Sequence, residues 1–241
     1  MRLIIGIDEV GRGAIAGPVV AGAVAIEKII PGVRDSKALN IKQRETLAQE
    51  IENHAIAVAI EIIHPKTIDK LNIHNATLLA MKNAFLSAIE QIDTKLDEVF
   101  IFIDGLHIFK INPDELNKQI NLNLIAIPRA DKFIYQVSCA SIYAKHTRDT
   151  MMMTIEHARF PDYNFKRNLG YPTPEHIRIL KQIGPCEIHR KSFLKNLNSA
   201  KASPQTKGSL GPLGQENLFK LAENIGKSDP PNKGVLRTFG K

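Results

Sequence analysis

The 241-residue sequence contains no tryptophan and only two cysteines, Cys139 and Cys186. Two cysteines are too few for a disulfide framework, and they form no Cys-x-x-Cys pair, so they fit a reducing compartment. No apolar run approaches the ~20 residues that cross a membrane. The first residues also lack the basic, apolar and small-residue order of a secretory leader. We therefore expect a cytoplasmic protein.

The composition is otherwise ordinary for a globular protein, with 44% hydrophobic and 24% charged residues. A formal net charge of +7 favours a polyanionic partner. Much of this excess lies in residues 198–241, where seven Lys or Arg face three Asp or Glu. Residues 199–212 are mostly Ser, Lys, Gly and Pro, which predicts a flexible linker. The sequence thus indicates a mildly basic folded body, followed by a basic tail.

The first apolar run, Ile4 to Ile7, leads directly into two carboxylates, Asp8 and Glu9, and then into a Gly-Arg-Gly turn. Neighbouring residues of a regular strand point to opposite faces of the sheet. The two carboxylates can therefore serve one site only where the pleat ends, and we expect the glycines behind them to end it. The alternative is that the pair belongs to a solvated turn.

Apolar runs of strand type alternate with segments of helical periodicity along most of the chain. The pattern predicts strands over residues 4–10, 19–26, 55–63, 99–103 and 122–127, and helices after Asn40, over 75–92 and over 131–157. The run 55–63 is almost continuously apolar, which predicts a strand buried on both faces. This alternation is typical of an α/β core with helices packed on a sheet.

Three of the expected strands deliver carboxylates at or just beyond their ends: Asp8 and Glu9, then Asp104, then Asp131. Ligand sites of α/β sheets usually form at the carboxyl ends of strands. Clustered carboxylates raise one another's pKa, and a hard divalent cation relieves this repulsion. Ligands that are all oxygen select Mg²⁺ or Mn²⁺. Two such ions ~3.5–4 Å apart hydrolyse phosphodiesters, one activating water and the other stabilising the leaving oxygen.

The alternative is that Asp104 is only a turn residue and Asp131 only a helix cap.

Seven motifs, in chain order, resemble those of the ribonuclease HII family. They are Gly6-Ile7-Asp8-Glu9-Val10-Gly11-Arg12-Gly13 with Ala16-Gly17-Pro18, Asp35-Ser36-Lys37, Ala76-Thr77-Leu78-Leu79-Ala80-Met81, Ile103-Asp104-Gly105, Arg129-Ala130-Asp131, Ala140-Ser141-Ile142 with Ala144-Lys145 and Arg148-Asp149, and Gly170-Tyr171-Pro172-Thr173. The resemblance implies an α/β ribonuclease H-like fold, a mixed central sheet flanked by helices with a small helical C-terminal subdomain. It divides the chain into a catalytic domain over residues 1–160, a helical substrate-binding subdomain over 161–197 and the tail.

This resemblance also implies an activity: hydrolysis of the RNA strand of RNA–DNA hybrids, and incision 5′ of single ribonucleotides embedded in duplex DNA. The products would carry 3′-hydroxyl and 5′-phosphate ends. By matching position, the catalytic and metal-binding carboxylates are Asp8, Glu9, Asp104 and Asp131, with two Mg²⁺ or Mn²⁺ ions during catalysis. We expect the enzyme to act as a monomer.

Recognition of a lone ribonucleotide requires contact with a 2′-hydroxyl. In the loop Gly11, Arg12 and Gly13, the missing Cβ atoms would let main-chain groups reach the sugar while the arginine holds the adjoining phosphate. The resemblance places Tyr171 against the following sugar; otherwise it is a buried tyrosine that locks a turn.

The other expected substrate contacts are cations that would bind phosphates. They are Lys37, Lys145, Arg148, Arg190 and Lys191. Since most surface lysines are simply solvated, the alternative at each lysine is a side chain with no ligand.

In the tail, Gln215, Leu218 and Phe219 resemble the short peptide by which bacterial replication and repair proteins dock on the sliding clamp. The alternative is a short amphipathic helix folded back on the body. Among rival functions, ribonuclease HIII would carry lysine in place of Arg12. A junction resolvase of the same fold and a catalytically silent hybrid-binding adaptor also remain open, although the four carboxylates speak against the adaptor.

Overall fold

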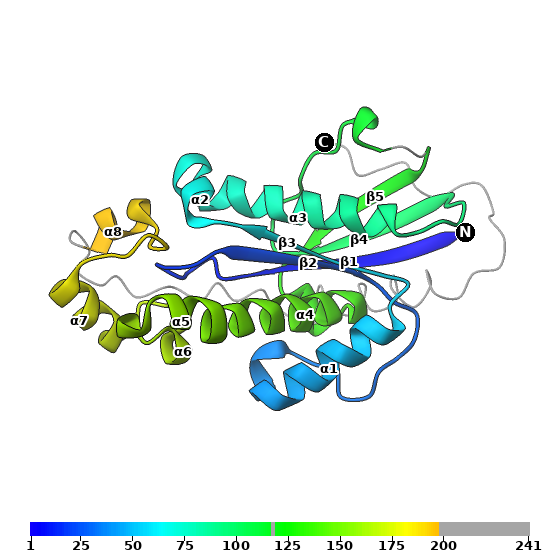
Figure 1. The fold of residues 1–241 in the computed structure, drawn as a ribbon. Coiled ribbons are helices and arrows are strands. Elements are labelled where there is room, and N and C mark those ends of the chain that lie inside the picture. The colour runs from blue at the N-terminus through cyan, green and yellow to red at the C-terminus, as the bar shows by residue number, and fades with distance from the viewer. Residues whose placement is uncertain (117–118, 198–241) are drawn as a thin grey trace, which may run out of the picture. The chain divides into compact units, whose positions relative to one another are not determined.

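The five strands form one mixed sheet in the computed structural model, which describes residues 1–116 and 119–197. The strands are β1 (Arg2–Val10), β2 (Val19–Ala25), β3 (Ala57–Ile63), β4 (Glu98–Asp104) and β5 (Asn121–Ile127). Their order across the sheet is β3-β2-β1-β4-β5. β2 runs antiparallel to both β1 and β3, whereas β4 and β5 run parallel to β1. The expected mixed α/β sheet is therefore confirmed (Figure 1).

Helices cover both faces of this sheet (Figure 1). One face carries α3 (Ile73–Glu90), and the other carries α4 (Tyr135–Met151), against which α1 (Ile41–His54) packs. The last helices follow the long α4 in sequence. The shorter helices are η1 (Ser36–Ala38), α2 (Pro65–Leu71), η2 (Pro113–Glu115), η3 (Ala130–Lys132), the π-helix η4 (Met152–Glu156), α5 (His157–Arg159), η5 (Pro161–Tyr163), α6 (Phe165–Asn168), α7 (Pro174–Ile183) and α8 (Lys191–Leu197).

The helix boundaries follow local capping chemistry. Asn40 begins α1 with a complete capping box, in which its side chain accepts from the Gln43 amide and the Gln43 side chain accepts from the Asn40 amide. At α7 the Thr173 side chain alone makes the cap, accepting from the His176 amide, and Pro174 occupies the first turn. The single helix expected over residues 131–157 is interrupted near its start, where η3 ends and Ile134 is extended. From Tyr135 onward it continues through α4 and η4 into α5.

Two glycines let α4 lie very close to the sheet. A Cβ on Gly6 would stand 2.1 Å from the carbonyl carbon of Gln136, and a Cβ on Gly22 would stand 2.9 Å from the carbonyl oxygen of Ala140. Any larger residue would force the helix away from β1. The close approach places the middle of α4 directly over the carboxyl end of β1.

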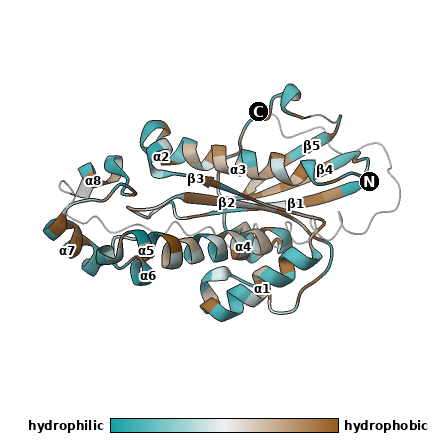
Figure 2. Cartoon of the chain, viewed as in Figure 1, coloured by the Kyte–Doolittle hydropathy of each residue, from teal (hydrophilic) through white to brown (hydrophobic). Residues whose placement is uncertain are grey.

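The central strands are mostly apolar, whereas α1 alternates apolar and polar residues (Figure 2). β2 is buried along its whole length. β3 is an edge strand with alternating burial, so the prediction that residues 55–63 are buried on both faces is wrong. The apolar run alone could not reveal that one side of this strand has no neighbour.

The described residues belong to one compact unit. The expected boundary near residue 160 between a catalytic domain and a helical subdomain stays a prediction. In the described part of the chain, no helix is both long and apolar enough to cross a membrane.

Candidate active site

The predicted carboxylates lie at the carboxyl ends of β1, β4 and β5 or just beyond them, and these ends meet because the three strands are adjacent and parallel. Ile7 pairs with Ile103, which places Asp8 beside Asp104 at the next position. Asp104 in turn pairs with Ile127 at the end of β5, and Asp131 follows in η3. Sheet register thus brings together residues that are 123 positions apart in the sequence.

Asp131 is fixed relative to the sheet by main-chain contacts around η3. The Ala130 amide donates to Asp104 Oδ1 at 2.7 Å, and the Ser138 hydroxyl donates to the carbonyl of Asp131 at 2.6 Å. Asp104 thereby accepts a hydrogen bond from the turn that carries the next carboxylate. Asp131 itself is 4% exposed.

The two carboxylates of β1 differ in their surroundings. Asp8 is 6% exposed and lies two positions after Gly6 on the α4 face, where Ser141 donates a hydrogen bond to it. Asp8 and Glu9 themselves lie within the regular pairing, which β1 keeps through Val10, and the first glycine behind them ends the strand as predicted. The break comes at Gly11, with φ +91°.

Glu9 is held from the loop that follows the strand. Arg12 Nη1 donates to Glu9 Oε1 at 3.2 Å. Its other oxygen, Oε2, is buried and has no hydrogen-bond partner. A buried, unpartnered carboxylate oxygen is costly and is an acceptor that remains open to a ligand.

Burial and mutual repulsion raise the pKa of all four carboxylates. Burial raises the pKa of Asp8 well above its usual range, and the charges of Glu9 and Asp104 raise it further. Burial also raises the pKa of Asp104, with a further contribution from the charge of Asp131. Each carboxylate therefore stands within electrostatic reach of the next.

For the other two carboxylates, nearby cations partly offset the effect of burial. The pKa of Glu9 is raised by burial and lowered in part by Arg12, and that of Asp131 is raised by burial and lowered in part by Lys37.

These four residues fit a hard divalent cation in donor chemistry, since all of their ligand atoms are oxygens. Within residues 1–116 and 119–197, however, no three His, Cys, Asp or Glu side chains lie close enough together to hold one ion as they stand. The alternation of Asp8 and Glu9 along a regular strand accounts for part of this separation. The assignment of all four as shared metal ligands stays a prediction.

Lys37 approaches the carboxylates from the loop that contains η1. Its charge lowers the pKa of both Asp104 and Asp131, and its side chain is exposed. The loop is locally ordered by Asp35, whose Oδ1 accepts from the Lys37 amide at 2.9 Å. Lys37 therefore stands where a substrate phosphate beside the carboxylates could bind.

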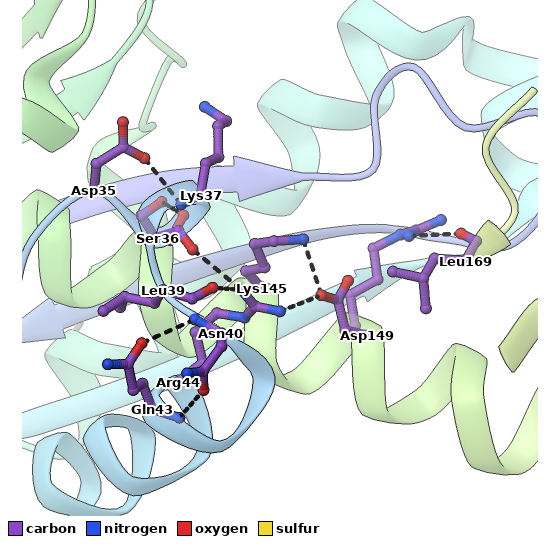
Figure 3. Close-up of polar contacts among 12 residues, drawn as sticks. Asp35, Ser36, Lys37, Leu39, Asn40, Gln43, Arg44, Lys145, Asp149 and Leu169 are labelled. Carbon is purple, nitrogen blue, oxygen red and sulfur yellow. Dashed lines mark hydrogen bonds and ion pairs between the residues drawn. The ribbon is translucent and has the colours of Figure 1, made fainter. Parts of the chain in front are cut away.

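A buried ion-pair network under this loop was not predicted from the sequence (Figure 3). Arg44 is 7% exposed and donates to the carbonyls of Ser36 and Leu39 at 3.2 and 2.5 Å. It also pairs with Asp149 Oδ2 at 3.3 Å, which Lys145 contacts at 2.9 Å. Arg44 thus ties the Lys37 loop to α4.

Lys145 is half-buried in this ion pair. Its expected phosphate contact stays a prediction.

Main-chain hydrogen bonds join the Gly-Arg-Gly loop to the turn that carries Tyr171. The carbonyl of Gly170 accepts from the amides of Ile15 and Ala16, at 2.9 and 3.1 Å. A Cβ on Gly170 would stand 2.3 Å from the carbonyl oxygen of Ala16, so only glycine permits this approach. Tyr171 and the loop form one unit as a result.

Arg148 does not contact solvent, so its expected phosphate contact is wrong. It is fully buried and donates to three carbonyls, those of Pro18, Leu169 and Ala16, at 2.9, 3.0 and 3.2 Å. Its guanidinium also lies over the ring of Tyr171, 5.2 Å from the centroid. Arg148 thus holds together the main chain of the segment that follows the Gly-Arg-Gly loop and that of the Leu169 turn.

Arg190 performs the same task from the C-terminal side. It is fully buried and donates to the carbonyls of Gly17 and Arg12 at 2.9 and 3.0 Å. Its burial contradicts the phosphate contact that was expected of it, and nothing in the basic run near the end of the domain signals a buried arginine. By contrast, Arg12 and Gly13 are exposed and Tyr171 is partly exposed, whereas Gly11, the first glycine of the loop, is buried.

The clamp-docking residues Gln215, Leu218 and Phe219 lie outside the described residues.

Comparison with known proteins identifies close relatives over nearly all of the described chain. A family model described as Ribonuclease HII matches residues 5–196. The ribonuclease HII of Caldicellulosiruptor saccharolyticus is 46% identical over 198 residues, which cover 81% of this chain and 89% of the relative. That of Burkholderia pseudomallei is 40% identical over 198 residues, covering 80% and 83%.

Solved structures share the fold. A chain of the PCNA:RNase HII complex from Archaeoglobus fulgidus aligns with a TM-score of 0.62 at 22% identity, covering 83% of this chain and 98% of that one. Ribonuclease H2 from Pyrococcus horikoshii aligns with a TM-score of 0.58 at 26% identity, covering 79% and 93%. Bst-RNase HIII in complex with Mn²⁺ aligns with a TM-score of 0.58 at 21% identity, covering 83% and 70%. The predicted ribonuclease H-like fold is confirmed.

Proposed function

Since the chain belongs to the ribonuclease HII family and is thus an endonuclease of RNA–DNA hybrids, we propose that it also incises 5′ of single ribonucleotides in duplex DNA. The observation that supports this proposal is the set of main-chain hydrogen bonds between the Gly-Arg-Gly loop segment and the turn that carries Tyr171. The carbonyl of Gly170 accepts from the amides that follow the Gly-Arg-Gly loop, so Tyr171 and that loop keep a fixed spacing. With a fixed spacing, the loop and Tyr171 can together recognise a single nucleotide step. A lone ribonucleotide offers only one such step, whereas a long hybrid offers many.

In this proposal, main-chain groups of Gly11 and Gly13 contact the ribose 2′-hydroxyl, and the exposed Arg12 holds the adjoining phosphate. The ring of Tyr171 stacks on the following deoxyribose. Arg12 also donates to Glu9, so the residue that contacts the phosphate positions a carboxylate of the active site.

We further propose that Asp8, Glu9, Asp104 and Asp131 hold divalent ions, Mg²⁺ or Mn²⁺. Their raised pKa values and the unpartnered Glu9 Oε2 support this, because a bound cation would relieve both. When bound, two such ions would supply the water activation and leaving-group stabilisation that in-line hydrolysis needs, giving 3′-hydroxyl and 5′-phosphate ends. Bst-RNase HIII, which shares the fold, is known in complex with Mn²⁺.

Lys37 has a separate role beside these carboxylates. Its exposed ammonium would bind the phosphate next to the cleaved bond, held in place by the loop that Arg44 ties to α4.

The decisive experiment is a cleavage map on a DNA duplex that contains one ribonucleotide, with Mg²⁺, with Mn²⁺ and with EDTA. We expect one cut, directly 5′ of the ribonucleotide, and no cut in an all-DNA duplex. Cutting of all-DNA junctions would favour a resolvase, and binding of hybrids without any cut would favour a silent adaptor. Either result would refute the proposal.

Asp104→Asn tests the metal assignment. We expect turnover to fall by more than about a hundredfold while hybrid binding stays within about threefold, because the amide removes a ligand charge and no phosphate contact. Activity within tenfold of the unmodified enzyme would refute the assignment.

Tyr171→Ala tests the recognition role. We expect it to reduce cleavage at a lone ribonucleotide more than cleavage within a long RNA tract. Tyr171→Phe is the matched control, since it retains the ring. Equal losses on both substrates would show that the side chain is structural.

The tail would give the enzyme a second partner. The Archaeoglobus fulgidus complex contains PCNA, and we propose that Gln215, Leu218 and Phe219 dock on a sliding clamp, with the basic linker as tether. The isolated tail peptide should bind a purified bacterial clamp, and a peptide with Leu218→Ala and Phe219→Ala should not. No association at high micromolar concentration would end this part of the proposal. We also propose that the enzyme acts as a monomer in the cytoplasm. We propose further that its catalytic domain and helical subdomain divide near residue 160.

A further inference from the structure

Two buried histidines lie behind Tyr171 and take no part in the activity described above. His176, in α7, is fully buried, and His189, before α8, is 2% exposed. Their Nε2 atoms are 3.1 Å apart. His176 Nδ1 lies 2.8 Å from the carbonyl oxygen of Tyr171, and His189 Nδ1 lies 3.0 Å from the amide nitrogen of Cys186.

Only one arrangement of protons satisfies these three contacts. The Tyr171 carbonyl can only accept, so His176 Nδ1 carries a proton. The Cys186 amide can only donate, so His189 Nδ1 carries none. His189 must then donate from Nε2 to an unprotonated Nε2 of His176. A proton added to either imidazole would break one of the contacts, so both rings are neutral.

The surroundings favour this neutral state. The rings of Tyr163 and Phe165 lie 4.9 and 5.9 Å from that of His189, centroid to centroid. Burial lowers the pKa of His189 to about 4, with a further contribution from His176. Burial also lowers the pKa of His176.

The relay connects the two recognition elements. At one end, His189 forms a β-bridge with Ala16, and its neighbours Ile188 and Arg190 hydrogen-bond to Gly17 and Ile15 at 2.9 Å each. At the other end, His176 contacts the main chain of Tyr171 itself. A chain of hydrogen bonds therefore runs from the segment after the Gly-Arg-Gly loop to the turn that carries Tyr171.

We propose that His176 and His189 form a neutral hydrogen-bond relay that positions Tyr171 against the Gly-Arg-Gly loop and thereby sets the preference for a lone ribonucleotide. This inference rests on the proposed incision of single ribonucleotides. The histidines touch no substrate, so they are positioning residues and not catalytic ones.

The relay itself can be tested without activity, by NMR of the protein with ¹⁵N-labelled histidine. At about neutral pH we expect one ring protonated only at Nδ1 and one only at Nε2, assigned through His176→Asn and His189→Asn. Rapid exchange between tautomers, or a protonated Nδ1 on His189, would overturn the relay.

A matched pair of substitutions tests its consequence. The side-chain amide of His176→Asn can donate from about the position of Nδ1, whereas that of His176→Gln sits near Nε2 and cannot reach the Tyr171 carbonyl. We expect Gln to lower the ratio of single-ribonucleotide to hybrid cleavage by about tenfold, the worth of one hydrogen bond of ~1.4 kcal/mol, and Asn to keep it within about threefold. Both remove the same ring, so thermal unfolding should shift by a similar amount in each.

Equal ratios in the two variants would show that His176 is merely structural and would overturn the inference. Tyr171→Ala, measured beside them, separates this failure from that of the proposed function. If Tyr171→Ala leaves the ratio unchanged, the recognition role of Tyr171 fails first. If Tyr171→Ala lowers the ratio and His176→Gln does not, only the relay fails.

Discussion

Acid should destabilise this protein through His189 in a way that a single substitution can isolate. In the unfolded chain His189 takes up a proton near its ordinary pKa of 6.5, whereas in the folded protein burial lowers that pKa to about 4. Between these two values the unfolded state binds more protons, so lowering the pH favours unfolding. The contribution of His189 is fully present above about pH 6.5 and is lost as the pH falls toward about 4.

The size of the effect follows from the two pKa values. Each pH unit between them is worth about 1.4 kcal/mol. The folded state therefore loses about 2 kcal/mol by about pH 5, and about 3 kcal/mol once both states are protonated. A typical domain is stable by only about 5–15 kcal/mol, so this loss is large enough to measure.

The four carboxylates change the stability with pH in the opposite direction, so the experiment needs a comparison in which their contribution cancels. Their pKa values are raised in the folded protein, so the folded state takes up protons more readily and gains stability as the pH falls through the raised values. His189→Asn keeps all four. Its side-chain oxygen can also accept from the Cys186 amide, and it does not titrate.

The assay is urea unfolding of both proteins at about pH 7.5 and about pH 5. The variant should be less stable at the higher pH, because it loses packing and the contact with His176. The gap between the two proteins should then shrink by about 2 kcal/mol at the lower pH. An unchanged gap would refute a neutral, buried His189.

Three further predictions concern other parts of the fold. Gly6→Ala should lower the free energy of unfolding in urea by at least about 3 kcal/mol, because the new Cβ would stand 2.1 Å from the main chain of Gln136. Gly13→Ala is the control: a Cβ there would have nothing within 4 Å, so the stability should hardly change. Asp69→Ala should cost about 1 kcal/mol in the same assay, because its carboxylate accepts from the first two amides of α8 at 2.9 Å each. Asp8→Asn should raise stability by about 1 kcal/mol at about pH 8 in EDTA, because it relieves repulsion in the cluster, and Mn²⁺ should then stabilise it less than the unmodified protein.

The strands and the carboxylates at their ends could be predicted because they depend on local patterns. Apolar β-branched runs followed by Asp and Gly mark Asp8 and Asp104, and the Asn40 capping box marks the start of α1. These signals need no knowledge of distant residues.

The errors arose where a residue's role depends on what packs against it. Arg148 lies in a polar stretch of α4 that resembles a surface, and it is buried by the segments that carry Ala16, Pro18 and Leu169. The apolar run of β3 resembles a central strand, and only the sheet order places it at an edge. Sequence separation, and not chemistry, hid each of these facts.

The fold buries unfavourable charges of both signs, one set at the carboxyl ends of the strands and the other beneath the Gly-Arg-Gly loop. Burial raises the pKa values of four carboxylates at the sheet edge, and it lowers those of two arginines beneath the recognition loop, that of Arg190 to about 9. Those arginines donate to main-chain carbonyls, so their charge is not neutralised by the contacts that hold them. A cation at the carboxylates and a phosphate over the loop would each relieve one of these costs. Hybrid and divalent ion bound together should accordingly stabilise the protein against unfolding by more than either ligand does alone. The reason is that the positive ion and the negative phosphate attract each other.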